Sequence, residues 1–269
     1  LCACGQREGA VPGIDLADLD ESVSPKVDFY KYAVGGWQKN HPLKPEYARY
    51  GSFDILGENN EKRLNDLFQS MSSLKAAHGT VEQKISDLYK MGLDSLRRNE
   101  EGAAPLKPYI DEILAISDKE ALVREIAAMH LASDSPFFGT YVMADMIDSD
   151  SNILYMSQSG LGMGDRDYYV KGCDPKLKDG YLAFLTKVLE LAGIDDAEGR
   201  AADALKVEDA LAESSWTSVE CRDMERQYNP TTFAELTTAY PNLSLGSYFE
   251  ALGVKPEGKI VVTQPSFFK

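Results

Sequence analysis

The strongest constraint on the fold is a set of apolar residues that recur three and four positions apart between residues 59 and 252. One such stripe consists of Leu64, Leu67, Phe68, Met71 and Leu74, and a second contains Ile85, Leu88 and Leu96. Residues at this spacing share one face of an α-helix. We therefore predict a mainly α body in which these stripes face a core and do not bind a cofactor.

Helix boundaries are indicated by capping pairs, in which a side-chain oxygen binds a backbone N–H of the first turn. The three pairs are Thr80 with Gln83, Ser117 with Glu120, and Thr232 with Glu235. A further helix is predicted over residues 175–192. Asp174 is its N-cap, Pro175 its first residue, and Gly193 supplies the left-handed C-terminal turn.

Two regions interrupt the helical pattern. Residues 138–146 and 153–159 are rich in Tyr, Val, Ile and Met, and the polar residues 148–152 separate them. This arrangement predicts a β-hairpin. Residues 259–264 predict a late strand that ends at Pro265. No internal repeat of solenoid length is visible, which argues against a helical-repeat binding protein.

The overall charge limits the classes of partner. The chain has 269 residues, a formal net charge of -15 and a pI near 4.7. Because a phosphate backbone requires a basic protein face, this composition argues against nucleic acid and favours peptides or small molecules. No apolar stretch approaches the ~20 residues that a membrane-spanning helix needs.

The N-terminus, Leu1-Cys2-Ala3-Cys4-Gly5, resembles the lipobox of bacterial lipoproteins. A lipid on Cys4 would tether the protein to an envelope membrane through a polar linker that ends near Ser24. The alternative is an expression remnant or a chance tetrapeptide. Of the other cysteines, Cys173 and Cys221 could form a disulfide or remain two buried thiols, and their spacing fits no C-x-x-C motif.

A zinc peptidase would be indicated by a H-E-x-x-H helix, which this chain lacks. Its histidines, His41, His78 and His130, have no second histidine four residues away with which to share a metal. We interpret them as packed or surface residues. No Gly-x-Ser-x-Gly elbow and no Cys/His pairing indicates a nucleophilic hydrolase.

Two further segments resemble ligand-binding loops but lack residues or charges that such loops need. Asp148, Asp150 and Asn152 copy the first ligands of an EF-hand, but Ile153 stands where glycine must turn the chain. We interpret them as a turn. The glycine-rich residues 160–164 suggest a phosphate loop, yet two aspartates follow directly and would repel the anion.

Five segments in order resemble the N-terminal region of the neprilysin or M13 zinc metalloendopeptidases, in their bacterial lipoprotein form. They are residues 28–37, 49–56, 160–169, 222–229 and 264–268. Val34 stands where animal members keep a disulfide cysteine. Met163 and Gly164 stand where the family usually has leucine-proline before Asp-Arg-Asp-Tyr-Tyr.

The resemblance implies one helical lobe of a two-lobed M13-type metallopeptidase. In the family, the zinc helix, a third glutamate ligand and the substrate strand lie downstream of the position of Lys269. We therefore expect a truncated chain with no zinc and no catalytic residue of its own. The expected segments are a lipoprotein N-terminus and linker (1–24), a part that packs on the missing catalytic lobe (25–60), a helical lobe over the substrate cavity (61–258), and a strand leading toward that lobe (259–269).

The resemblance also implies two substrate-binding residues, Arg49 and Asp54, on the primed side of the cleft. A guanidinium can pair with the free carboxylate of a short peptide, and a neighbouring aspartate can orient it. The alternative is a structural ion pair in an ordinary loop. Residues 165–169 are interpreted as structural, because alternating charge beside paired tyrosines is typical of a loop held on a core.

These expectations favour the non-zinc portion of an envelope zinc endopeptidase that acts on oligopeptides. Its partners would be peptide substrates, the missing C-terminal catalytic portion, and a membrane through the lipid on Cys4. The alternative is a catalytically inactive peptide-binding or scaffold lipoprotein that keeps only the helical lobe. A truncated chain should also leave apolar surface unpaired on residues 27–60 and on the last strand.

Overall fold

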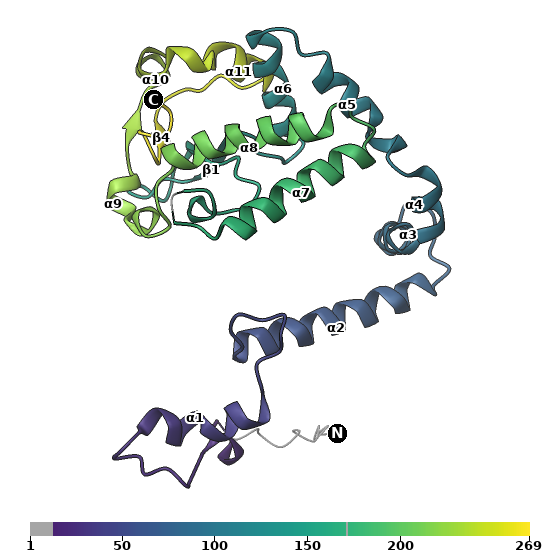
Figure 1. Ribbon diagram of the computed structural model, residues 1–269, viewed down its shortest axis with the longest axis vertical. Coiled ribbons are helices and arrows are strands. Elements are labelled where there is room, and N and C mark those ends of the chain that lie inside the picture. Colours follow the sequence, from purple (N-terminus) through teal and green to yellow (C-terminus); the bar gives the residue numbers. More distant parts are fainter. Residues whose placement is uncertain (1–12, 171) are drawn as a thin grey trace, which may run out of the picture. The chain divides into compact units, whose positions relative to one another are not determined.

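A computed structural model describes residues 13–170 and 172–269, which are mainly helical (Figure 1). Cys4, the predicted lipidation site, lies outside the described residues. The chain divides into two compact units, Leu1–Arg97 and Arg98–Lys269, and each is considered by itself. The expected segments 25–60 and 61–258 concern packing on a further part of the polypeptide and stay predictions. No helix in the two described ranges has the length and apolar character needed to cross a membrane.

The first unit is a series of capped helices. They are a 3₁₀ turn (Leu16–Asp18), α1 (Phe29–Asn40), α2 (Ser52–Ser72) and α3 (Val81–Leu93), and α4 (Ser95–Glu101) begins at the unit's end. Thr80 caps α3 by accepting the Gln83 N–H at 3.3 Å, as predicted. Helices α2 and α3 pack through Phe68 and Tyr89, whose ring centres lie 5.8 Å apart.

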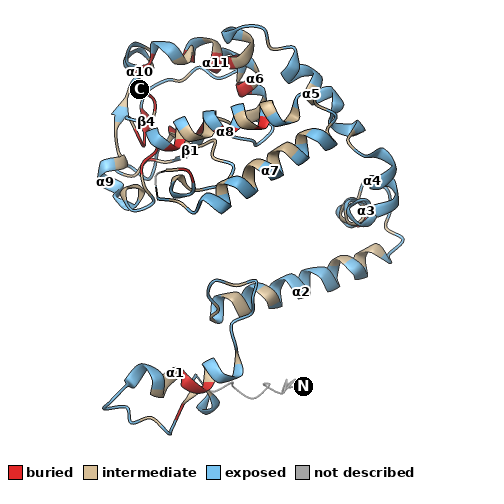
Figure 2. Ribbon diagram, viewed as in Figure 1, coloured by how far each residue is buried: buried red, intermediate tan, exposed pale blue. Residues whose placement is uncertain are grey.

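The first unit buries little apolar surface in its described part, as Figure 2 shows. Leu64 and Leu67 expose 41% and 50% of their surface and Leu88 exposes 72%, so the prediction that these stripes face a core was wrong: the helices formed, but little within the unit packs against them. Phe29 and Phe53 expose 69% and 89% of their surface, and Val27 and Leu56 are also exposed. The expectation of unpaired apolar surface on residues 27–60 is therefore confirmed.

The second unit holds the remaining helices. They are α5 (Lys107–Leu114), α6 (Lys119–Leu131), α7 (Pro175–Leu191), α8 (Ala197–Ser214), α9 (Met224–Gln227), α10 (Phe233–Ala239) and α11 (Leu245–Ala251), with 3₁₀ turns at Ala104–Leu106, Arg166–Tyr168, Glu220–Arg222 and Pro241–Leu243.

The predicted caps of this unit are correct with one exception. Asp174 accepts the Lys176 N–H at 3.0 Å at the start of α7, and Gly193 follows the helix with a φ of +73°. Thr232 caps α10. The cap of α6, however, is Asp118 and not Ser117, because the Asp118 carboxylate accepts the Ala121 N–H at 2.8 Å. The prediction was wrong by one residue because either side chain suits an N-cap.

Four strands form one sheet in the order β1-β2-β4-β3. Their bounds are β1 (Phe138–Ala144), β2 (Asn152–Gln158), β3 (Pro230–Thr231) and β4 (Ile260–Val262). β1 and β2 form the predicted antiparallel hairpin, in which Phe138 faces Gln158. β4 is the predicted late strand, and it pairs parallel to β2 and antiparallel to β3. The two-residue β3 was not predicted, because it is too short to show an alternating pattern.

The main core lies between this sheet and helices α6, α10 and α11. Its members include Phe138, Met156, Leu236, Tyr248, Phe249 and Ile260. The three residues of β4 expose only 1%, 0% and 3% of their surface. The expectation of unpaired apolar surface on the last strand was therefore wrong, because β4 lies between β2 and β3 and so is buried within its own unit. Tyr169, Leu205 and Ala212 form a second, smaller core beside α7 and α8.

The cysteine alternatives are resolved in favour of thiols. Cys173 and Cys221 are half-buried and form no disulfide in the described part of the chain. Burial raises the pKa of the Cys221 thiol.

Candidate functional site

In the first unit, the Glu58 carboxylate holds the segment between α1 and α2, residues 41–51, through three hydrogen bonds. Glu58 accepts hydrogen bonds from Lys44 Nζ at 2.6 Å, Tyr47 OH at 2.9 Å and Tyr50 OH at 2.8 Å. These hydrogen bonds lower the pKa of Glu58 to about 2, with the largest contribution from Lys44, then Tyr50, then Tyr47. Glu58 was not among the predicted site residues, because no motif links it to partners so scattered in sequence.

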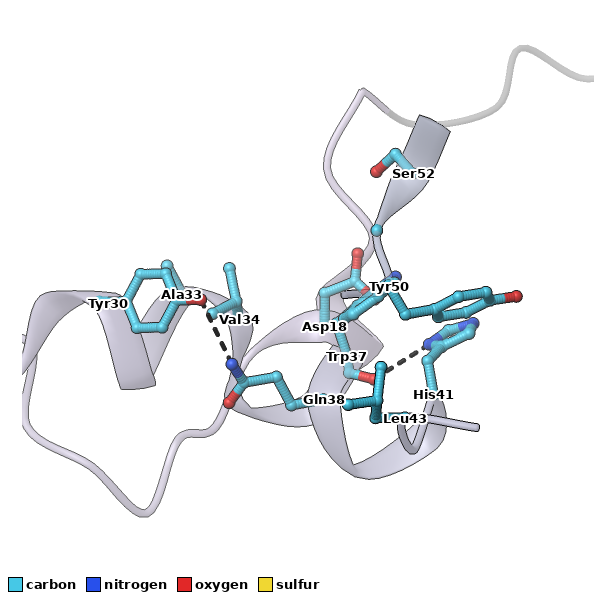
Figure 3. A pocket seen from close by; sticks show the side chains of 11 residues that line it. Asp18, Tyr30, Ala33, Val34, Trp37, Gln38, His41, Leu43, Tyr50 and Ser52 are labelled. Carbon is cyan, nitrogen blue, oxygen red and sulfur yellow. Dashed lines mark hydrogen bonds between the residues drawn. The ribbon is translucent and has the colours of Figure 1, made fainter. Parts of the chain in front are cut away.

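An open hollow of about 550 Å³ lies beside this segment (Figure 3). Trp37 of α1 stacks on His41 with ring centres 4.5 Å apart and on Tyr50 at 6.2 Å. The His41 Nδ1–H donates to the Trp37 carbonyl at 3.0 Å. Stacked rings on one wall give the hollow a rigid, partly apolar surface.

Arg49 precedes Tyr50, one of the residues that line this hollow, and its side chain is exposed. Among residues 13–170 and 172–269, no ion pair or hydrogen bond uses its guanidinium. Asp54 is half-buried and its carboxylate accepts the Gly51 N–H at 2.7 Å, which caps α2. The structure thus places both residues at one turn but shows no ion pair between them, and their role in substrate binding stays a prediction.

The described ranges contain no group of three or more His, Cys, Asp or Glu side chains able to hold a metal ion. His41 stacks on Trp37, and His78 is exposed. His130 is half-buried, with Nδ1 2.7 Å from the Tyr248 hydroxyl. Burial lowers its pKa. His41 and His130 thus pack against aromatic neighbours, and His78 lies at the surface.

The two rejected motifs have structural roles. Asp148 accepts the Ser151 hydroxyl at 2.8 Å in the hairpin turn. In the glycine-rich segment, the Gly162 N–H donates to the Glu208 carboxylate at 3.2 Å. A side chain of the protein therefore uses the backbone donor that a phosphate loop would offer to its ligand.

Residues 165–169 hold this loop on the second core, as predicted. The Asp165 carboxylate accepts the Asp167 N–H at 2.9 Å. Tyr169 is 5% exposed and its hydroxyl both accepts the Met163 N–H and donates to Glu208.

The sequence profile described as peptidase family M13 matches residues 25–269. Endothelin-converting enzyme 1 of Homo sapiens is 30% identical over an alignment of 269 positions that covers 94% of this chain and 34% of that protein. The chain therefore spans about a third of the length of the curated relatives it matches.

Solved structures agree with that match. Mycobacterium tuberculosis zinc metalloprotease ZMP1 in complex with an inhibitor superposes with a TM-score of 0.84 at 29% identity, covering 95% of this chain and 40% of that one. PepO from Lactobacillus rhamnosis HN001 gives a TM-score of 0.73 at 18% identity over 91% of this chain and 39% of that one. At that identity the likeness concerns the fold alone.

Proposed function

This chain belongs to peptidase family M13, and we propose that it forms the non-zinc portion of a zinc endopeptidase that hydrolyses oligopeptides. The observation that carries this proposal is the profile match over residues 25–269, together with a relative named as a zinc metalloprotease. These peptidase names do not favour the alternative of an inactive scaffold lipoprotein. In the proposed enzyme, this chain contributes cavity walls and selects substrates.

We infer that this portion does not hold the zinc, because residues 13–170 and 172–269 contain no group of three or more His, Cys, Asp or Glu side chains that could bind a metal ion. We assign zinc and the catalytic base to the remainder of the polypeptide, as the ZMP1 structure is much longer than this chain. There the metal would polarise the water that attacks the peptide bond. No step of that chemistry is assigned to residues 13–170 or 172–269.

Substrate selection is assigned to Arg49. Its guanidinium is exposed and unpaired among the described residues, which leaves its planar set of N–H donors free for a carboxylate. The Glu58 hydrogen bonds fix Tyr50, the next residue, and Asp54 fixes the backbone of Gly51. A charged side chain on a turn so fixed is preorganised to bind the free C-terminus of a short peptide. Asp54 contributes by positioning the turn.

The exposed apolar residues of segment 25–60 are assigned to contact with the remainder of the polypeptide. Burying surfaces such as those of Phe29 and Phe53 is favourable by about 25 cal/mol for each Å² removed from water. We further propose a lipid on Cys4 and a location in the bacterial envelope, both of which rest on the lipobox-like N-terminus.

The test is peptide hydrolysis by the complete polypeptide that contains this chain. We expect cleavage of oligopeptides that stops with a zinc chelator and returns with added zinc, and no cleavage by the 269-residue chain alone. Activity that persists in the chelator, or peptidase activity of the 269-residue chain itself, would contradict the assignment. A complete polypeptide that binds peptides without cleaving them would favour the scaffold alternative.

A further inference from the structure

β1 is an edge strand of the four-stranded sheet, because the strand order begins with it. Among the described residues it pairs with β2 alone, in an antiparallel pairing of seven residues. An edge strand presents a row of backbone N–H and C=O groups to whatever lies beside it.

The register shows which groups of β1 are free. The Asp145 N–H donates to the Ser151 carbonyl at 2.8 Å, which makes these residues a hydrogen-bonded pair. Because hydrogen-bonded and non-hydrogen-bonded pairs alternate in an antiparallel ladder, Thr140 and Val142 direct their N–H and C=O groups, and Ala144 its N–H, away from β2 and toward the open edge. The Ala144 carbonyl accepts the Tyr155 hydroxyl at 3.0 Å and is therefore already used.

The side chains along the second half of β1 are accessible. Val142 exposes 68% of its surface, and Tyr141 and Met143 are also exposed. Beyond the strand's end, Ile147 exposes 75% and lines a hollow of about 360 Å³ with Met146, Met224, Glu225 and Tyr228. Flexible methionine side chains allow such a hollow to fit apolar groups of different shape.

The charges around the end of β1 are predominantly negative. Asp150 and Glu225 are exposed, and Asp148 lies in the same hairpin turn. Two cations of this region are paired with acids: Lys259 Nζ lies 2.5 Å from the buried Asp145 carboxylate, and Arg226 lies 3.0 Å from the Glu220 carboxylate. Arg222, just before α9, is exposed. The surroundings are thus complementary to a basic side chain.

We propose that the edge of β1 is a docking site for an extended peptide that adds a fifth strand to the sheet. Backbone hydrogen bonds with Thr140, Val142 and the Ala144 N–H supply the pairing, as in other cases of strand addition. An apolar side chain of the peptide enters the hollow beside Ile147, and a basic side chain lies near Glu225 and Asp150. This binding does not require peptidase activity, so its test is independent of the proposed function.

The probe is a fluorescein-labelled synthetic peptide of alternating valine and lysine, titrated against the full chain. Its first control is the same peptide with N-methyl groups on alternate amides, which cannot complete the edge hydrogen bonds. Its second control replaces lysine with glutamate. We expect both controls to bind about ten-fold or more weakly.

Three variants test the location. Val142→Pro removes one outward N–H and is tolerated at an edge strand, whereas Val142→Thr keeps the N–H and a β-branched side chain. Binding should fall about ten-fold with Val142→Pro and be retained with Val142→Thr. Glu225→Lys, at an exposed position on α9, should weaken binding of the lysine peptide and strengthen binding of the glutamate peptide. This variant tests the location even if the proline variant fails to fold.

Equal binding of the N-methylated and unmodified peptides would overturn the proposal. So would equal binding by Val142→Pro and Val142→Thr when both are folded. A chain that dimerises in sedimentation experiments, and becomes monomeric only with Val142→Pro, would show that a second copy occupies the edge instead.

Discussion

The Tyr50 hydroxyl donates a 2.8 Å hydrogen bond to the Glu58 carboxylate, which ties the residue after Arg49 to helix α2. Lys44 and Tyr47 donate to the same carboxylate. One acid therefore fixes the segment that presents Arg49. In the proposed enzyme, Glu58 would be a positioning residue, and its loss should loosen the segment without removing the arginine.

We expect Glu58→Gln to increase hydrogen exchange of residues 44–52, because a neutral amide cannot replace the charge-assisted bonds. The effect should depend on pH. The folded pKa of Glu58, about 2, lies below its ordinary value of 4.5, so its stabilisation is complete above pH 4.5 and is lost as the pH falls toward 2. The protection of the native segment, expressed relative to the intrinsic exchange rate at each pH, should therefore fall between pH 5 and pH 2. Glu61→Gln, an exposed neighbour on α2, is the control. Similar exchange in the two variants would show that Glu58 does not hold the segment.

Replacing two glycines by alanine should change the free energy of unfolding in opposite directions. Gly160 has a φ of +90°, and a Cβ there would lie 2.6 Å from Phe137 N, so Gly160→Ala should destabilise the protein by about 1–3 kcal/mol. Gly180 lies within α7 with open space around it, so Gly180→Ala should stabilise by about 0.5–1 kcal/mol. Urea unfolding of both variants measures these changes. A stable Gly160→Ala variant would show that the loop does not pack as described.

His130 should make the folded protein sensitive to mild acid. Burial lowers its pKa below the ordinary 6.5, an effect that the Pro136 carbonyl and Asp134 oppose. The neutral ring is therefore favoured on folding, so the stability is fully present above pH 6.5 and decreases as the pH falls toward the folded pKa. Thermal unfolding between pH 8 and pH 5 should show a shallower pH dependence in His130→Gln than in the wild type. His78→Gln, at an exposed position, should behave like the wild type, and a shallower dependence there too would argue against His130 as the source.

Much of the fold could be predicted because it depends on local signals. The three-and-four spacing of Leu64, Leu67 and Phe68 and the cap at Thr80 act within one or two turns of chain, so they can be read without tertiary contacts. The burial of β4 could not be predicted in this way. Its apolar residues suit either an exposed interface or a core, and only its pairing with β2 and β3 decides between them.

The candidate site was predictable only in part. A family motif led to Arg49 and Asp54, but local spacing could not show that Asp54 caps α2 through Gly51. Glu58 and its donors join residues up to fourteen positions apart, and such contacts depend on the path of the intervening loop. The same holds for the open edge of β1, which follows from the strand order and not from the residues of the hairpin.

The most direct test of the account measures kcat/KM of the complete polypeptide on matched peptides that end just past the cleavage site, with either a free or an amidated C-terminus. For Arg49→Met, the loss of a charge-assisted pair costs about 1.5–3 kcal/mol, or roughly ten- to a hundred-fold on the free acid. The amidated peptide should be nearly unaffected, and Asp54→Asn should give a weaker form of the same pattern. Arg63→Met, at an exposed position on α2, is the matched control and should change neither. Equal losses on the free-acid and amidated peptides would contradict the account and show that Arg49 supports the fold.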